Sequence, residues 1–259
     1  MIKFAKMHGN GNDFVMVNSL EKEFNPKKTL IKKLGDRNLG IGFDQMIHIG
    51  APSKDNRDFT VKFYNSDGGQ ANMCLNGVRC AATYVWDNKF APQRTLRFQT
   101  KRIDIECRPL KEGVEVSLKK PKYFISQDLE KKLSKIIKTS FNLIDSGNLH
   151  LCLQKKSIDE FDLNGLYKKL EALLRPLGIN LSIYSKDKDS YNIRTYENGV
   201  GETLSCGSAS FSVAYLCLID EIKKTTIKSS GGSIKFTKLD DRIMMSGPTK
   251  FVYSGSFHE

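Results

Sequence analysis

The sequence of 259 residues lacks three features that would each indicate a particular class of protein. No apolar run approaches the roughly eighteen residues of a membrane span, so we expect no transmembrane segment and no membrane partner. The opening segment MIKFAKMHGNGNDF lacks the apolar core and cleavage site of a signal peptide, which favours a cytoplasmic location and reduced cysteines. The six cysteines form neither a CxxC pair nor a His-rich cluster, so we expect no metal site.

A concentrated basic surface is also missing, although the net charge is +12. The lysines are spread along the whole chain, and we find neither an RNP-type aromatic motif nor a helix-turn-helix signature. The segment KKLSKIIK at 131–138, for example, is typical of the solvated face of an amphipathic helix. We therefore expect no nucleic-acid partner. The length suits two small domains, each with its own core.

The chain contains a weak internal repeat. YNSDGGQANMC at 64–74 aligns without a gap on YENGVGETLSC at 196–206, which matches Cys74 to Cys206. Upstream, GNDFVMV at 11–17 resembles GNLHLCL at 147–153 at nearly the same offset. The common order of these matches favours two copies of one unit, with a boundary near residue 120.

The pattern of apolar residues predicts an α+β protein. Alternation of apolar and polar residues predicts strands, and apolar residues at helical spacing predict helices. The strands are expected at 59–64, 113–120, 191–196 and 242–247, and the helices at 27–37, 128–138 and 162–175. A run of small and apolar residues follows each repeated cysteine and suits a helix buried inside a sheet.

Each repeated cysteine is therefore expected at the beginning of a helix. The free N–H groups and partial positive charge of a helix N-terminus favour a thiolate and lower the thiol pKa toward neutrality. If the two halves face each other about a pseudo-two-fold axis, the two thiols flank one cleft. Such a pair suits the inversion of a carbon stereocentre, in which one thiolate removes a proton and the opposite thiol delivers one. The chemistry needs no pyridoxal phosphate.

The sequence resembles the diaminopimelate epimerase family over nearly its whole length. The resemblance is carried by KMHGNGNDFV (6–15), DRNLGIGFDQ (36–45), YNSDGGQANMCLNGVRC (64–80), SGNLH (146–150) and GVGETLSCGS (199–208). It implies two pseudo-symmetric α+β domains, each with a curved, mainly antiparallel sheet around a central helix, and an active site between them. The domains would be 1–120 with 248–259, carrying Cys74, and 121–247, carrying Cys206.

The resemblance also implies the site residues and the activity, which belongs to lysine biosynthesis. Cys74 and Cys206 correspond to the acid/base thiols, and His150 and Glu197 to residues that assist proton transfer. The residues expected to hold the substrate are Asn12, Gln45, Asn65, Asn76, Gly77, Asn148, Asn180, Asn198, Gly207 and Ser208. The expected enzyme is an isomerase that converts L,L-diaminopimelate to the meso form without a cofactor. Its expected partner is the small-molecule substrate, and a homodimer is a possible assembly.

Two alternatives remain open at the level of sequence. The family carries an arginine where this chain has Asn198, and that arginine grips the far carboxylate of the substrate. A racemase of another amino acid, such as histidine, would retain the chemistry with a rebuilt far end of the pocket. A ligand-binding or thiol-redox protein on the same scaffold is the alternative from a different class.

Overall fold

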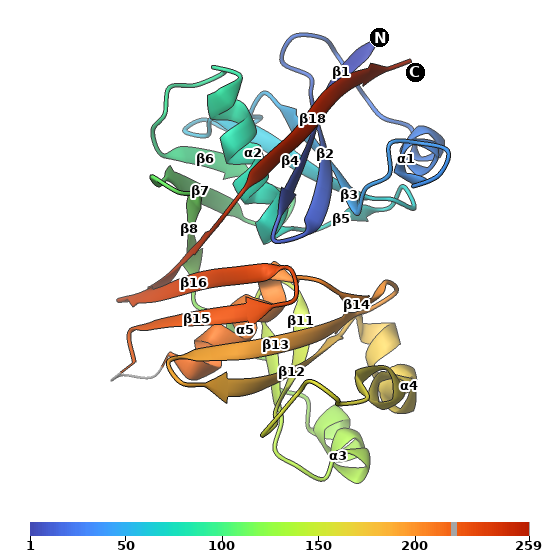
Figure 1. Ribbon diagram of the computed structural model, residues 1–259, viewed down its shortest axis with the longest axis vertical. Helices are drawn as coiled ribbons and strands as arrows, with labels where there is room; N and C mark the ends of the chain where they lie inside the picture. Colours follow the sequence, from blue (N-terminus) through green and yellow to red (C-terminus); the bar gives the residue numbers. More distant parts are fainter. Residues whose placement is uncertain (219–221, 259) are drawn as a thin grey trace. The chain divides into compact units, whose positions relative to one another are not determined.

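The structure is a computed structural model that describes residues 1–218 and 222–258. It contains two compact units, which we describe separately (Figure 1). Unit 1 comprises Met1–Leu118 together with Ser246–Glu259, and unit 2 comprises Lys119–Met245. Across the described residues, every helix is too short or too polar to cross a membrane.

Unit 1 is a sheet-rich unit with two helices in its described part. Its elements are β1 (Ile2–Gly9), β2 (Asn12–Asn18), α1 (Lys28–Gly35), β3 (Gln45–Gly50), β4 (Phe59–Asn65), β5 (Gln70–Ala71), α2 (Leu75–Asp87), β6 (Leu96–Gln99), β7 (Asp104–Pro109), β8 (Val114–Lys119) and β18 (Lys250–Phe257). The last strand, β18, pairs antiparallel with the first, β1, so both ends of the chain lie side by side in this unit (Figure 1).

Unit 2 presents its elements in a closely similar order. They are β9 (Lys122–Tyr123), α3 (Gln127–Ile136), β10 (Asn142–Asp145), β11 (Leu149–Gln154), α4 (Leu163–Leu174), the 3₁₀ turn η1 (Arg175–Leu177), β12 (Asn180–Asp187), β13 (Ser190–Glu197), β14 (Gly201–Thr203), α5 (Gly207–Cys217), β15 (Lys224–Ser229), β16 (Gly232–Leu239) and β17 (Arg242–Gly247). The last two residues of β17, Ser246 and Gly247, belong to unit 1. The series from β10 to β17 thus repeats the series from β1 to β8, apart from η1.

The strand registers repeat as well as the element order. An antiparallel hairpin opens each unit, β1 with β2 and β10 with β11. The second strand of each hairpin then pairs in parallel with the next strand, β2 with β3 and β11 with β12. That strand pairs antiparallel with its successor, β3 with β4 and β12 with β13. The same pairing scheme in both units supports the duplication detected in the sequence.

A helix that is buried along most of its length packs against the strands of each unit. Helix α2 contacts β1, β2, β3, β4 and β7, and α5 contacts β11, β12, β15 and β16. Small residues permit this close packing: a Cβ atom on Gly77 would lie 2.9 Å from Ile47 Cδ1. Because strands cover a central helix on several sides, a run of small and apolar residues is required there rather than an amphipathic stripe.

The outer helices cover separate apolar clusters. In unit 1, Ile31 and Leu34 of α1 pack with Phe43 and Met46. In unit 2, α3 and α4 pack their apolar faces over β11 and β12, with Leu133 and Leu170 fully buried. The predicted α+β class is confirmed, and each helix and strand predicted from periodicity is present, with ends displaced by at most two residues.

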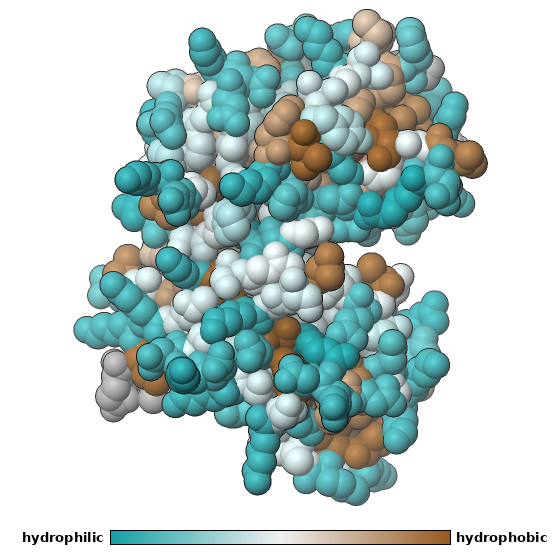
Figure 2. All heavy atoms as spheres, in the orientation of Figure 1, coloured by the Kyte–Doolittle hydropathy of each residue, from teal (hydrophilic) through white to brown (hydrophobic). Residues whose placement is uncertain are grey.

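Figure 2 shows polar and charged residues over most of the visible face of each unit. Many arginines are engaged with carboxylates, among them Arg57 with Asp104 and Arg94 with Asp58. These pairs neutralise part of the positive charge of the chain.

Candidate active site

Cys74 is the N-cap residue of α2. Its extended backbone (φ −143°, ψ 110°) turns the chain into the helix, and the Gly77 N–H donates to its sulfur at 3.3 Å. The thiol is partly exposed, unlike the buried Cys80 on the same helix. Because a helix N-terminus offers unsatisfied N–H groups, this position favours negative charge on the sulfur. Asn76 and Gly77 occupy the same first turn, and Asn76 is fully buried.

Three of the predicted polar ligands occupy neighbouring strand ends beside this thiol. Asn12 begins β2, and its Oδ1 accepts a hydrogen bond from the Cys74 thiol at 3.6 Å. Gln45 begins β3 and is paired in register with Asn65 at the end of β4. The Gln45 Nε2 group donates to Asn65 Oδ1 at 2.8 Å. The structure therefore brings Asn12, Gln45 and Asn65 to one edge of unit 1.

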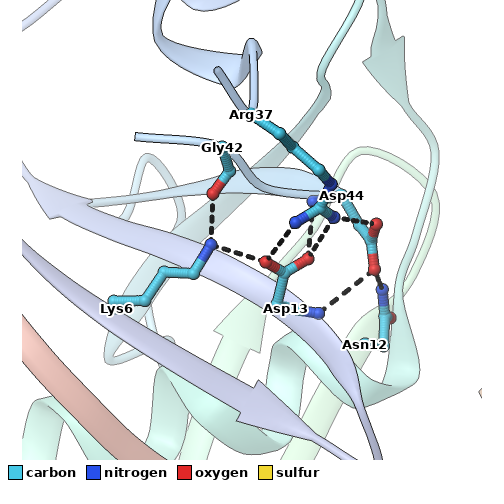
Figure 3. Close-up of polar contacts among 6 residues, drawn as sticks. All are labelled: Lys6, Asn12, Asp13, Arg37, Gly42 and Asp44. Carbon is cyan, nitrogen blue, oxygen red and sulfur yellow. Dashed lines mark hydrogen bonds and ion pairs between the residues drawn. The ribbon is translucent and has the colours of Figure 1, made fainter. Parts of the chain in front are cut away.

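A charged network fixes the orientation of the Asn12 amide (Figure 3). Asn12 Nδ2 donates to Asp44 Oδ2 at 2.7 Å, so the amide oxygen is the atom left for Cys74. Arg37 bridges Asp44 and Asp13 with bonds of 2.8 Å to each carboxylate. Sequence reasoning did not single out Asp44, although it immediately precedes Gln45 in the DRNLGIGFDQ motif.

The centre of this network is Asp13. Burial by itself raises the pKa of a carboxyl group, but hydrogen bonds and charge from Arg37 and Lys6 lower the pKa of Asp13 to about 2. The buried Lys6 ammonium also donates to the carbonyl of Gly42 (Figure 3). These contacts connect β1 and β2 to the segment between α1 and β3. Two of the expected substrate-binding residues, Asn12 and Gln45, begin β2 and β3.

Cys206 occupies the equivalent N-cap position before α5 in unit 2. Its sulfur lies 3.5 Å from the hydroxyl oxygen of Ser208, which also contacts His150 Nε2 at 3.0 Å. Asn148 Nδ2 donates to the same hydroxyl oxygen at 3.3 Å. Gly207 is the first residue of α5. Ser208 therefore connects Cys206, His150 and Asn148.

The tautomer of His150 follows from its burial. The ring is fully buried, its Nδ1 atom has no hydrogen-bond partner, and burial lowers the pKa of His150 to about 3. We assign the proton to Nε2, because a buried N–H donor without an acceptor is less favourable than an unused acceptor. His150 then donates to Ser208, and the Ser208 hydroxyl is free to donate to the Cys206 sulfur.

The expectation that a helix N-terminus lowers the thiol pKa is wrong for Cys206 in this structure. Burial raises the pKa of Cys206 well above its usual value, and the nearby negative charge of Glu197 raises it further. The Ser208 hydroxyl and the Ala209 N–H act in the opposite direction but are outweighed. Only 8% of Cys206 is exposed, and desolvation of a thiolate is stronger than the field of one helix end. Cys206 is therefore held as a neutral thiol.

The other predicted residues of unit 2 lie at the matching strand ends. Asn180 begins β12 in parallel register with His150, and Glu197 ends β13. Thr203 donates its hydroxyl hydrogen to Glu197 Oε1 at 2.6 Å, a partner that the sequence analysis missed. Asn12, Gln45, Asn65 and Cys74 of unit 1 thus correspond in position to Asn148, Asn180, Glu197 and Cys206 of unit 2.

Asn198 is engaged in a structural contact. Its Nδ2 group lies 3.1 Å from the carbonyl oxygen of Arg175 and 3.4 Å from that of Leu174, at the end of α4. Its backbone N–H donates to Asn180 Oδ1 at 2.8 Å. The side chain therefore satisfies carbonyl groups at the helix C-terminus, which lack partners within the helix.

We also searched the described residues for a metal site. Within 1–218 and 222–258, no group of three or more His, Cys, Asp or Glu side chains is arranged to hold a metal ion. All six cysteines are thiols rather than disulfides.

Comparison with known proteins relates this arrangement to one family. A family model described as diaminopimelate epimerase matches residues 4–123. The diaminopimelate epimerase of Psychrobacter arcticus is 30% identical over 277 residues, covering 99% of this chain and 94% of that protein. The diaminopimelate epimerase of Wigglesworthia glossinidia brevipalpis is 32% identical over 278 residues, covering 99% and 100%.

The fold also recurs in a more distant solved structure. A hydroxyproline epimerase from Agrobacterium vitis has a TM-score of 0.68 and 12% identity, covering 98% of this chain and 90% of that one. The fold and the relatives define an isomerase of the amino-acid epimerase and racemase class. Within that class, the chain belongs to the diaminopimelate epimerase family, as its motifs predict.

Proposed function

We propose that the protein converts L,L-diaminopimelate to meso-diaminopimelate by a two-base thiol mechanism without pyridoxal phosphate. The observation that carries this proposal is the repeated N-cap cysteine, Cys74 in α2 and Cys206 in α5. Each thiol lies within a unit whose neighbouring strand ends carry amide or carboxylate side chains. The substrate is taken from the relatives, which are named diaminopimelate epimerases.

The two thiols differ in how readily they lose a proton. Cys206 is held as a thiol by burial and by Glu197, which suits it to deliver a proton. Cys74 is partly exposed and accepts the Gly77 N–H, which suits it to remove one. In this direction Cys74 takes the α-proton and Cys206 protonates the opposite face of the carbon. The reverse reaction exchanges these roles, as microscopic reversibility requires.

The helix ends also suit the charge that develops during the reaction. Removal of the α-proton places negative charge on the substrate carboxylate, and backbone N–H groups at a helix N-terminus stabilise such an anion. One well-placed donor of this kind is commonly worth about a hundredfold to a thousandfold in rate. The polar residues that would orient the amino and carboxylate groups are Asn12, Gln45, Asn65, Asn76, Asn148 and Asn180.

His150 and Ser208 are proposed to orient the Cys206 thiol and to stabilise its thiolate form. The Ser208 hydroxyl accepts from His150 Nε2 and donates to the Cys206 sulfur in the assigned tautomer. When Cys206 becomes a thiolate, this hydroxyl stabilises the new charge by a charge-assisted hydrogen bond. The negative charge of Glu197 disfavours the thiolate, so Cys206 readily takes a proton again in the reverse reaction.

The contacts of Asn198 favour a second candidate, a racemase of another amino acid such as histidine. Asn198 is neutral and caps the end of α4, so it supplies no charged clamp for a far carboxylate. A bidentate arginine clamp would contribute charge-assisted bonds worth about 1.5–3 kcal/mol each. A substrate whose far end is uncharged would not need this interaction.

Chiral chromatography of the purified protein without added pyridoxal phosphate tests both candidates. L,L-diaminopimelate is compared with a panel of single L-amino acids that includes histidine, and Cys74→Ala and Cys206→Ala serve as matched controls. We expect the wild-type protein to invert diaminopimelate and both variants to be inactive. Inversion of a monocarboxylic amino acid alone would favour the second candidate, and inversion by either variant at the wild-type rate would exclude the two-base mechanism.

A further inference from the structure

Arg79 has an unusual environment for a charged side chain. It lies on α2 and is completely buried. It is the largest of the described side chains that are fully buried. Nη2 donates to Asn10 Oδ1 at 2.9 Å, whereas Nε and Nη1 are buried without a hydrogen-bond partner. A guanidinium has five N–H donors, and its burial without a counter-charge is strongly unfavourable. This arrangement therefore requires an explanation.

Two glycines leave the space that the guanidinium fills. A Cβ atom on Gly247 would lie 3.1 Å from Arg79 Cζ and Nε. A Cβ atom on Gly9 would lie 3.3 Å from Arg79 Nη2 and 3.4 Å from the backbone oxygen of Asn76. Asn76 belongs to the first turn of α2, the turn that Cys74 caps. The side chain thus extends back along the helix and brings its charge to the end that carries Cys74.

The ionisable groups that act on Arg79 are thiols. Helix α2 packs against β1, β2, β3, β4 and β7, and among the described groups on these elements Cys80, Cys74 and Cys107 influence Arg79. Burial lowers the pKa of the Arg79 guanidinium, and these three thiols raise it. No carboxylate of the described chain is among the groups that act on it.

Two of these thiols are unsuited to be the counter-ion. Burial raises the pKa of Cys80 to about 12, and it raises the pKa of Cys107 further. Both remain neutral at physiological pH. Cys74 differs because it is partly exposed and accepts the Gly77 N–H, although the neutral thiol also donates to Asn12 Oδ1 and loses that bond on ionisation. On the side of Asn12, the carboxylates of Asp13 and Asp44 are bound by Arg37, which limits their repulsion of a Cys74 thiolate.

We propose that Arg79 is a positioning residue whose buried positive charge favours the thiolate form of Cys74. The thiolate supplies the negative charge that the guanidinium otherwise lacks, and the low-dielectric interior strengthens their attraction. The inference rests on the proposed role of Cys74 as a base. This effect adds to that of the helix N-terminus. Helix α5 begins in the same way before Cys206, whose pKa burial and Glu197 instead raise.

The pH dependence of Cys74 alkylation tests this inference in the full-length protein. Iodoacetamide reacts with the thiolate, and mass spectrometry of the modified peptides measures the rate at Cys74 separately from that at Cys206. For the wild-type protein we expect a midpoint below the ordinary thiol value of about 8.5. In Arg79→Met the midpoint should rise by about one unit, which makes alkylation near neutral pH about tenfold slower.

Arg79→Lys and Arg94→Met are the matched comparisons. Arg79→Lys keeps the charge and should retain most of the acidic midpoint. Arg94→Met removes an exposed guanidinium of the same unit, which is paired with Asp58, and should leave the profile unchanged. A purely structural role for Arg79 would alter the rate at high pH, where Cys74 is fully ionised, rather than the midpoint.

Two results would overturn the inference. One is a wild-type midpoint at or above about 8.5, a measurement that does not depend on whether any variant folds. The other is a folded Arg79→Met protein with the wild-type midpoint; if that variant does not fold, Arg79→Gln takes its place in the comparison with Arg79→Lys. The assay requires no substrate, so its outcome is separate from that of the epimerisation assay.

Discussion

Replacing Ser208 by alanine removes the hydroxyl that joins three groups of unit 2. This oxygen accepts from Asn148 Nδ2 at 3.3 Å and from His150 Nε2 at 3.0 Å in the assigned tautomer, and its hydrogen is directed to the Cys206 sulfur at 3.5 Å. All of its hydrogen-bonding capacity is used, because a hydroxyl has one donor and two acceptor positions. Alanine fits sterically but replaces none of these bonds.

The expected loss of stability comes mainly from His150. An unsatisfied buried donor costs about 1–3 kcal/mol, and His150 is completely buried. Asn148 is partly exposed, so water can replace much of its bond to Ser208. We therefore expect the free energy of unfolding to fall by about 2 kcal/mol, as measured by urea denaturation.

The effect on Cys206 is the more specific readout. The Ser208 hydroxyl lowers the pKa of Cys206, which burial raises, so its removal should raise that pKa further. A hydrogen bond to a charged group is worth about 1.5–3 kcal/mol. Its loss should therefore reduce the fraction of Cys206 present as thiolate by about tenfold or more. Iodoacetamide should therefore modify Cys206 about tenfold more slowly at a fixed pH. The rate at Cys74 in the same sample serves as an internal control.

Ser212→Ala is the matched control for this prediction. Ser212 is a fully buried serine one turn further along α5, and its hydroxyl lies within hydrogen-bond distance of Ser146 Oγ and of the backbone oxygen of Ser208. Its loss should reduce stability while leaving the Cys206 rate unchanged. The reasoning is refuted if a folded Ser208→Ala protein is alkylated at Cys206 as fast as Ser212→Ala and the wild type.

Two further predictions concern pH and substrate. Burial, and then the charge of Lys62, lowers the pKa of His48 to about 4, so the unfolded chain takes up protons near pH 6.5 before the folded protein does. The stabilising contribution of His48 is therefore present above about pH 6.5 and is lost as the pH falls toward 4. Urea unfolding at pH 7, 6 and 5 measures how the free energy of unfolding falls with pH. This fall should be smaller in His48→Phe than in the wild type or in His258→Gln, a control at an exposed histidine. Asn198→Arg should lose the bonds to Leu174 and Arg175, cost about 1 kcal/mol in urea unfolding, and lower the KM for L,L-diaminopimelate; an unchanged KM would show that position 198 does not contact the far carboxylate.

The sequence by itself determined the elements and the repeated thiol positions. Apolar periodicity reflects whether one face or both faces of an element are buried, and it is therefore readable from neighbouring residues. The runs after Cys74 and Cys206 indicate helices buried on all sides, as α2 and α5 are. The gapless alignment of 64–74 on 196–206 likewise corresponds to equivalent strand, loop and helix elements in the two units.

Only the tertiary structure decided the electrostatic state of these positions. Cys206 is a neutral thiol because surrounding strands bury it and Glu197 approaches it, and the local sequence indicates only the helix end. Asn198 caps α4, whose last residues lie more than twenty positions earlier in the chain. Arginine is a residue type that is mostly exposed, but Arg79 lies wholly in the interior. Its guanidinium lies beside Gly9 and Gly247, which are distant from it in the sequence. Local periodicity shows on which helix or strand a functional residue lies. Its burial and its hydrogen-bond partners depend on packing between elements that are distant in the sequence, and these set its charge.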